Sequence, residues 1–334
     1  MKNNYFKSPV IASSGLLGFF GEGYKYHFFL RMIFPFFGYI IKKYMTFQSK
    51  TTTAFKRIGN LRLENDGYTV ADFYPNCIRA NLFKGVGINN VSLSGPGIFA
   101  LLAENKWQKM KGEIHLSVML VGNTKAERLK EAETIASVLK SELKNFQAYK
   151  IFLHWNVSCP NTGHDAMKEF LENFEVENKI LKNIGLPLFI KVAWNFPIEL
   201  AVAIQKRGMA DGFDAINTIP FDDLPEETKK KYFLQTIWNY ISPLDKYNKF
   251  YNVKGRGGVS GNPIRRYALG WIINARNAGV TLPIIGGGGI LNLRHVYQFK
   301  KVGATAVSPG SVIFLRPWNL IFIILYARLI FKKH

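Results

Sequence analysis

The sequence predicts a (β/α)8 barrel, on three observations. Short β-rich segments alternate with longer amphipathic segments, a pattern typical of parallel strands joined by crossover helices. Eight segments of each kind can be distinguished. Asparagine, lysine and glycine residues stand where most of the strand-like segments end, and the C-terminal strand ends of such a barrel form one face. An open, doubly wound sheet is the structural alternative.

The expected strands are short and rich in β-branched or aromatic residues. They span 38–43, 85–89, 114–119, 150–155, 188–192, 214–217, 283–286 and 305–308. The expected helices span 24–34, 97–104, 125–143, 166–183, 197–207, 263–278, 293–301 and 317–331. Asn123-Thr124 and Asn262-Pro263 are typical helix starts, because a capping side chain or an early proline suits the unpaired N–H groups there.

The chain is long enough for one large core. It has 334 residues, of which 48% are hydrophobic, and closed barrels of this size commonly form one domain. We therefore interpret 1–334 as a single domain. Two polar, aromatic and charged segments, at about 47–84 and 222–251, exceed a simple barrel and are expected to cross its C-terminal mouth, the second as a lid.

The charge and cysteine content restrict the classes of partner. A net charge of +21 predicts attraction to anions, but the basic residues are scattered rather than clustered, which makes nucleic acid an unlikely partner. Cys77 and Cys159 match no zinc-ligand spacing, so we expect no metal and a reducing, cytoplasmic location. The apolar C-terminal segment WNLIFIILYARLIFKKH ends in cations and is too short to span a bilayer, so peripheral membrane contact is an alternative.

Candidate functional residues stand at the expected strand ends. They are Lys43, Asn89, Asn156, Ser158, Cys159, Asn161, Lys191, Asn217 and Thr218. Glycine-rich segments GRGGVSG, IIGGGGI and SPGS precede or follow the last strands. Glycine lets backbone N–H groups approach a phosphate, and the loops after strands seven and eight are the usual phosphate site of these barrels. None of these segments forms a dinucleotide-binding GxGxxG fingerprint after a first strand.

Several motifs resemble those of the dihydroorotate dehydrogenase family. They are SPVIASSG, IIKKYMT, RIGN, INNVSLSGPG, NVSCPNTG, FIKVAW, FDAINT, GGVSG, PIIGGGGI and GATAVSPGS, in family order from about Ser8 to Pro317. The resemblance implies a flavin-dependent barrel that uses FMN to oxidise dihydroorotate to orotate in pyrimidine biosynthesis. It also suggests a homodimer.

The resemblance assigns roles by position. Substrate contacts would come from Lys43, Asn89, Asn156, Ser158, Asn161, Asn217 and Thr218. FMN would be bound by Ser14, Gly15, Lys43, Lys191, Gly258, Gly288, Gly289, Gly310 and Ser311. Asparagine suits a pyrimidine because its amide offers both a donor and an acceptor. Lys191 would stabilise negative charge on the reduced ring.

Cys159 matches the family's catalytic base, which removes the C5 proton of dihydroorotate while hydride passes from C6 to the flavin. A cysteine at this position is typical of the soluble members, whereas quinone-linked members have serine. Fumarate, a quinone, or NAD through a partner subunit remain alternatives for the electron acceptor. Two other functions stay open: a tRNA dihydrouridine synthase-like flavoprotein, which the basic charge would suit, and an FMN-containing barrel acting at a membrane surface.

Overall fold

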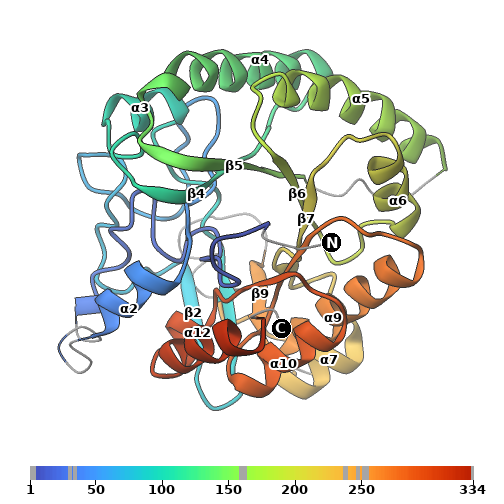
Figure 1. The fold of residues 1–334 in the computed structure, drawn as a ribbon. Helices are drawn as coiled ribbons and strands as arrows, with labels where there is room; N and C mark the ends of the chain where they lie inside the picture. The colour runs from blue at the N-terminus through green and yellow to red at the C-terminus, as the bar shows by residue number, and fades with distance from the viewer. Residues whose placement is uncertain are drawn as a thin grey trace.

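The fold was analysed in a computed structural model that describes residues 5–28, 32, 36–157, 164–235, 240–245, 249 and 256–331. Its main element is a curled, seven-stranded parallel sheet with helices on its outer face (Figure 1). In sheet order the strands are β1 (Phe47–Gln48), β4 (Gly112–Val118), β5 (Ala148–Asn156), β6 (Leu188–Val192), β7 (Gly212–Ala215), β10 (Ile284–Gly287) and β11 (Ala306–Ser308). The predicted (β/α)8 class is therefore confirmed.

An extended segment near the N-terminus completes the ring of strands. Val10 pairs in parallel with Val307 of β11, and Ile11 pairs in parallel with Thr46, the residue before β1. The backbone N–H of Ile11 donates to the Val307 carbonyl at 3.0 Å, and that of Ala12 donates to the Thr46 carbonyl at 2.8 Å. Residues 9–12 thus join the two edges of the seven-stranded sheet, so its edge strands are not left unpaired.

Six of the eight predicted strands are confirmed as β4, β5, β6, β7, β10 and β11. The strand predicted at 38–43 is wrong, because Phe37–Tyr44 forms helix α2. The strand predicted at 85–89 exists as β3 (Val86–Asn89), but it pairs antiparallel with β2 (Ile78–Asn81) and lies outside the barrel sheet. The two places in the ring are taken by residues 9–12 and by β1.

Seven of the eight predicted helices are confirmed, and the eighth, predicted at 24–34, falls partly on residues outside the described part of the chain. The seven are α3 (Ile98–Ala103), α4 (Lys125–Glu142), α5 (His164–Lys182), α6 (Ile198–Lys206), α9 (Asn262–Asn277), α10 (Leu293–Lys301) and α12 (Asn319–Ile330), with α7 (Glu226–Tyr232), α11 (Val312–Leu315) and the 3-10 turn Leu143–Asn145 in addition. Thr124 caps α4 as predicted, accepting the Glu127 N–H at 3.2 Å in a reciprocal capping box. Gly261 rather than Asn262 is the residue before α9.

A second sheet supplies part of the functional site. Its order is β2, β3, β9 (Gly258–Gly261) and β8 (Ile219–Pro220), and its strands pair antiparallel. β2 belongs to the predicted 47–84 excursion, whose first residues, however, form barrel strand β1. α7 belongs to the predicted 222–251 excursion, of which residues 236–239, 246–248 and 250–251 lie outside the described part. The assignment of 1–334 to one domain stays a prediction.

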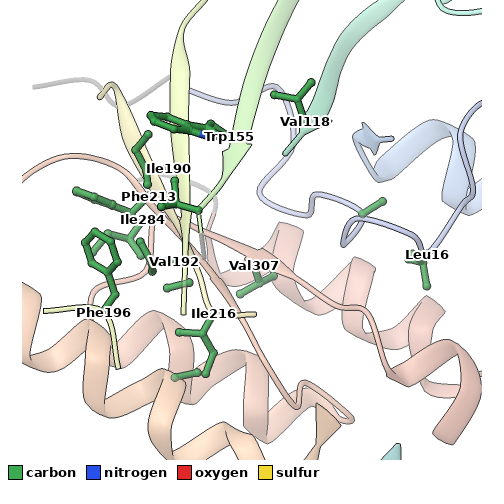
Figure 2. Packing of buried hydrophobic residues seen from close by; sticks show 14 of the residues in the cluster. Leu16, Val118, Trp155, Ile190, Val192, Phe196, Phe213, Ile216, Ile284 and Val307 are labelled. Carbon is green, nitrogen blue, oxygen red and sulfur yellow. The ribbon is translucent and has the colours of Figure 1, made fainter. Parts of the chain in front are cut away.

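Alternation along the barrel strands separates two environments. Ile190 and Val192 of β6 face outward and pack with Trp155, Phe213 and Ile284 beneath the helices, as Figure 2 shows. Phe189, the residue before Ile190, belongs to a separate apolar cluster with four further buried residues: Ile11, Phe152, Ile285 and Ala306. Because successive side chains of a strand point to opposite faces, this second cluster fills the barrel interior. Tyr5 and Phe6 pack against it.

The barrel interior requires a glycine at one position. A Cβ on Gly212 would lie 2.1 Å from Cε1 of Phe189, which is completely buried. We predict that Gly212→Ala lowers the free energy of unfolding by about 1–3 kcal/mol, because the close-packed ring must move. Urea denaturation measures the difference. Gly270→Ala is the matched control: nothing lies within 4 Å of a Cβ in the middle of α9, so stability should hold or rise. Equal effects of the two changes would contradict the packing assignment.

Candidate functional site

A cavity of about 350 Å³ opens where the barrel strands β5, β6, β7, β10 and β11 end. Eleven of the residues selected from the sequence line it: Ser14, Gly15, Asn89, Asn156, Lys191, Asn217, Thr218, Gly288, Gly289, Gly310 and Ser311. Gly258 lies directly behind this wall, since a Cβ there would meet Thr218 Oγ1 at 2.4 Å. These residues come from distant parts of the sequence, and the barrel brings them to one mouth.

Two asparagines are held in contact at the cavity wall. Nδ2 of Asn217 donates to Oδ1 of Asn156 at 2.6 Å, and the backbone N–H of Asn217 donates to the Val192 carbonyl at 3.0 Å. The contact leaves the Asn156 amide nitrogen and the Asn217 amide oxygen to face other groups. Asn89 lines the same cavity from the end of β3. The set offers donors and acceptors to a flat, polar ring.

Lys191 is a buried cation at the base of this cavity. It is only 8% exposed and stands beside Asp214 in the register of β6 with β7. Burial by itself raises the pKa of the Asp214 carboxyl, but the charge of Lys191 and hydrogen bonds from His154 and Gln48 hold it below its ordinary value. Asp214 is therefore ionised and balances the charge of Lys191.

A polar chain continues from Asp214 into the barrel. His154 Nδ1 lies 3.3 Å from Asp214 Oδ2, and its Nε2 lies 2.7 Å from Nδ1 of His115. Glu113 Oε1 follows at 3.3 Å from His115 Nε2. Burial, and then the neighbouring His154, lower the pKa of His115 well below its ordinary value, so this ring is neutral near pH 7. In the sequence, only the positions of Glu113, His115 and His154 within the predicted strands could have indicated this series of polar contacts.

The lysine expected at the first strand is a different residue from the one predicted. Lys43 is exposed on α2, with its Nζ 2.7 Å from the Tyr39 hydroxyl, and it does not line the cavity. Lys50 does, at 8% exposure, because the first barrel strand is β1 and not 38–43. Its Nζ donates to the Ser94 carbonyl and lies 4.7 Å from the Phe19 ring centroid. The β-branched stretch TFQSKTTT was the signal that could have identified it.

A glycine cradle forms the opposite wall. Gly288 and Gly289 have φ of +103° and +79°, and a Cβ on Gly289 would lie 2.3 Å from the Gly261 carbonyl oxygen. A Cβ on Gly310 would lie 2.9 Å from Ser13. The chain therefore approaches the cavity here with bare backbone, as an anion such as phosphate requires.

Two residues missed by the sequence reasoning support the cradle. Nδ1 of His295 accepts the backbone N–H of Leu291 at 3.1 Å and also lies 3.1 Å from Nη1 of Arg265. Burial, and then the charge of Arg265, lower the pKa of His295 to about 4. The ring is thus neutral and free to accept through Nδ1 at neutral pH. Both residues lie on helices, α9 and α10, and the sequence pattern does not distinguish them from ordinary surface side chains.

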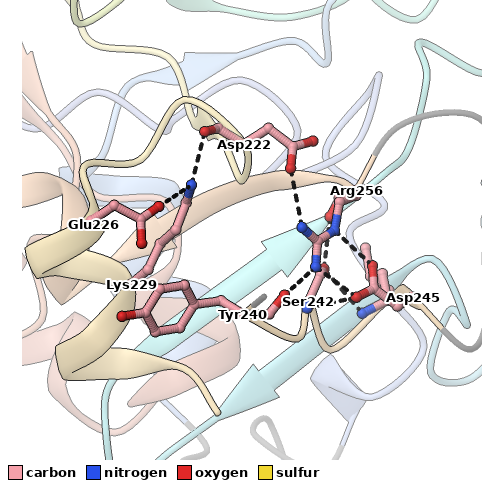
Figure 3. A network of polar contacts seen from close by, with 8 residues as sticks. Asp222, Glu226, Lys229, Tyr240, Ser242, Asp245 and Arg256 are labelled. Atoms are coloured by element: carbon pink, nitrogen blue, oxygen red, sulfur yellow. Dashed lines mark hydrogen bonds and ion pairs between the residues drawn. The ribbon is translucent and has the colours of Figure 1, made fainter. Parts of the chain in front are cut away.

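Arg256 ties the excursion after β7 to the edge of the site (Figure 3). Its Nε and Nη2 donate to the two oxygens of Asp245 at 3.0 and 2.8 Å, and its Nη1 donates to Asp222 at 3.2 Å. The guanidinium also stacks 4.5 Å from the Phe221 ring centroid. A bidentate arginine fixes both partners, so the clamp orders the chain that leads into Gly258.

Three residues selected from the sequence lie outside the described part of the chain: Ser158, Cys159 and Asn161. The structure describes β5 to its end at Asn156 and the next residue, Val157. The backbone N–H of Val157 donates to the Lys191 carbonyl at 3.1 Å. Val157 therefore lies directly beside Lys191.

Comparisons with known proteins agree on one family. The family model for dihydroorotate dehydrogenase matches residues 1–324. Among curated relatives, the catalytic subunit of dihydroorotate dehydrogenase B (NAD(+)) from Caldicellulosiruptor saccharolyticus is 28% identical, over 93% of this chain and 86% of its own length. Dihydroorotate dehydrogenase A (fumarate) from Lactobacillus delbrueckii subsp. bulgaricus is 29% identical, over 92% and 84%.

The fold has solved counterparts. A crystal structure of the Eimeria tenella enzyme in complex with ferulenol superposes with a TM-score of 0.59 at 15% identity, covering 96% of this chain and 81% of that one. A ligand-free form from the same organism gives 0.53 at 16% identity, with 86% and 76% covered. At such identities the likeness concerns the fold alone.

The buried Lys50 predicts a pH-dependent stability. Burial lowers its pKa from 10.5 to about 8, so between these values the unfolded chain binds a proton that the folded chain has released. Relative to Lys50→Met, the ligand-free wild type should gain on the order of 2 kcal/mol of unfolding free energy from pH 8 to 10.5. Chemical denaturation at both pH values tests this, with the exposed Lys43→Met as control. A constant difference between wild type and Lys50→Met would contradict the prediction.

Proposed function

Because the chain belongs to the dihydroorotate dehydrogenase family, we propose that it oxidises (S)-dihydroorotate to orotate in pyrimidine biosynthesis, with FMN as its flavin. The observation on which this proposal rests is the convergence of three asparagines, two buried lysines and a glycine cradle on one cavity. The asparagines and lysines suit a pyrimidine carboxylate, and the glycine cradle suits the phosphate of the cofactor.

The substrate side of the site consists of amides and a cation. Asn89, Asn156 and Asn217 present donors and acceptors that match the alternating N–H and C=O groups of a pyrimidine ring. Thr218 adds a hydroxyl from the same loop. Lys50, and not Lys43, supplies the charge for the substrate carboxylate, because Lys50 is buried in the cavity wall and Lys43 does not line the cavity.

The flavin side consists of Lys191 and the bare backbone. The cradle at Gly288, Gly289 and Gly310 has no room for a Cβ, which fits a phosphate held by backbone N–H groups. A flavin held between these groups would supply the acceptor for the hydride that leaves C6 of the substrate. Lys191, with Asp214 beside it, would supply positive charge to the flavin ring. Ser14 and Gly15 lie along the remaining wall.

Cys159 is the proposed base, with Ser158 directly before it and Asn161 two residues after it. Its thiolate takes the C5 proton as the C5=C6 double bond forms, so that a proton and a hydride together leave the substrate. The tie between Val157 and Lys191 supports this role, since it starts the cysteine-bearing segment at the cavity. The tRNA dihydrouridine synthase alternative is set aside, because the family match covers nearly the whole chain.

The electron acceptor is external to this chain. The names of the relatives give NAD(+) for the B form and fumarate for the A form. A screen of fumarate, quinones and NAD with a partner subunit, started from anaerobically reduced protein, would identify the acceptor by the return of flavin absorbance.

Anaerobic addition of dihydroorotate should bleach the flavin absorbance of the purified protein. Cys159→Ala should slow this reduction by about 10²-fold or more at fixed pH, the usual scale for loss of a general base. Stopped-flow absorbance measures the rate.

Cys77→Ala is the matched control, because Cys77 is the other cysteine of the sequence, is buried and does not line the cavity. It should reduce at the wild-type rate. A flavin-loaded protein that dihydroorotate fails to bleach would refute the proposed substrate, whereas rapid bleaching of Cys159→Ala would refute only the role of the cysteine.

A further inference from the structure

Two segments of the sequence contain no acidic residue. Residues 24–44 contain Lys25, Arg31, Lys42 and Lys43, and residues 316–334 contain Arg316, Arg328, Lys332 and Lys333. Both are otherwise rich in Phe, Ile, Leu and Tyr. Eight cations without one carboxylate are a strong bias even for a chain of net charge +21.

Helix α12 and the residue before it present an apolar stripe that is exposed among the residues that the structure describes. Trp318, Phe322, Leu325 and Leu329 recur at helical spacing and are 45–67% exposed. The opposite side of α12 is fully buried through four residues: Leu320, Ile323, Ile324 and Ala327. The helix thus has apolar side chains both on the side that reaches the core and on the exposed side.

Helix α2 and the residues before it extend this apolar face. Phe28, Met32, Phe36 and Tyr39 are all more than half exposed. α2 and α12 lie side by side at the same edge of the barrel (Figure 1), and the Arg328 guanidinium stacks 4.5 Å from the Tyr44 ring centroid. We call this combined surface of Phe28, Met32, residues 36–43 and residues 318–329 the α2–α12 face. Lys42 and Lys43 are exposed at its border.

We propose that the α2–α12 face docks the protein on an anionic membrane surface. Helices that lie in the plane of a bilayer combine aromatic and aliphatic side chains on one side with flanking Lys and Arg, and they bind anionic lipid more strongly than neutral lipid. A second copy of this chain is a poorer occupant, because it would bring two acid-free, cationic surfaces together.

The protein lies on the membrane rather than across it. Among the residues that the structure describes, no helix is long and apolar enough to span a bilayer. α12, the most apolar, has 12 residues and is about 18 Å long, well short of the roughly 30 Å hydrocarbon core. Its exposed side chains can enter only the interfacial region.

The test is flotation of the flavin-loaded full chain with vesicles. Wild type should float with phosphatidylcholine–phosphatidylserine vesicles, and about 10-fold more weakly with phosphatidylcholine alone or in high salt. Phe322→Glu/Leu325→Glu and, separately, Phe36→Glu/Tyr39→Glu should lose about 10-fold or more of the binding to anionic vesicles.

The matched control is Phe99→Glu/Tyr149→Glu, which makes the same charge change at two exposed aromatic residues outside the α2–α12 face, one on α3 and one at the start of β5. It should float like wild type. Bleaching by dihydroorotate, which does not involve this face, shows that each variant is folded. Absence of wild-type flotation, or equal losses in the control, would overturn the proposal. So would stripe-dependent dimerisation in light scattering without vesicles, since that result would assign the face to a second copy.

Discussion

Closure of the barrel by residues 9–12 is the constraint on which the rest of the structure depends. The segment bonds to β11 on one side and to Thr46, just before β1, on the other, so it fixes the first strand relative to the last. Ser13, Ser14 and Gly15 follow at once and enter the cavity wall. Lys50, which follows β1, lines the same cavity as Gly288 and Gly289.

The interior of this barrel is divided along its axis. Phe152 and Phe189 fill the end from which the strands start, and Tyr5 and Phe6 pack against them. A buried polar chain from Glu113 to Asp214 follows, and Lys191 meets it at the cavity. Removing one member of such a chain leaves a buried charge without compensation, so these side chains act as one unit. Asp214, the last member of this chain, therefore lies beside Lys191 and balances its charge.

The site and the α2–α12 face use different parts of the chain. The cavity is built by strand ends and the loops that follow them, which a rigid sheet holds in register. The face is built by helices on the outside, where α12 packs on the core through one side only. The segment 38–43, predicted as the first strand, belongs to helix α2 on this face and not to the site, so Lys43 is exposed and does not line the cavity.

The sequence by itself determined the six confirmed strands, the helices between them and the convergence of Asn156, Lys191 and Asn217, because local periodicity and strand-end chemistry are visible in one dimension. Only the tertiary structure decided the first strand. FGYIIKKY is as β-branched and aromatic as a strand, whereas Val10-Ile11 is too short to stand out. Their roles depend on pairing with Val307 and Thr46, and those partners are distant in sequence. Because β1 and not 38–43 lies in the barrel sheet, Lys50 rather than Lys43 lines the cavity.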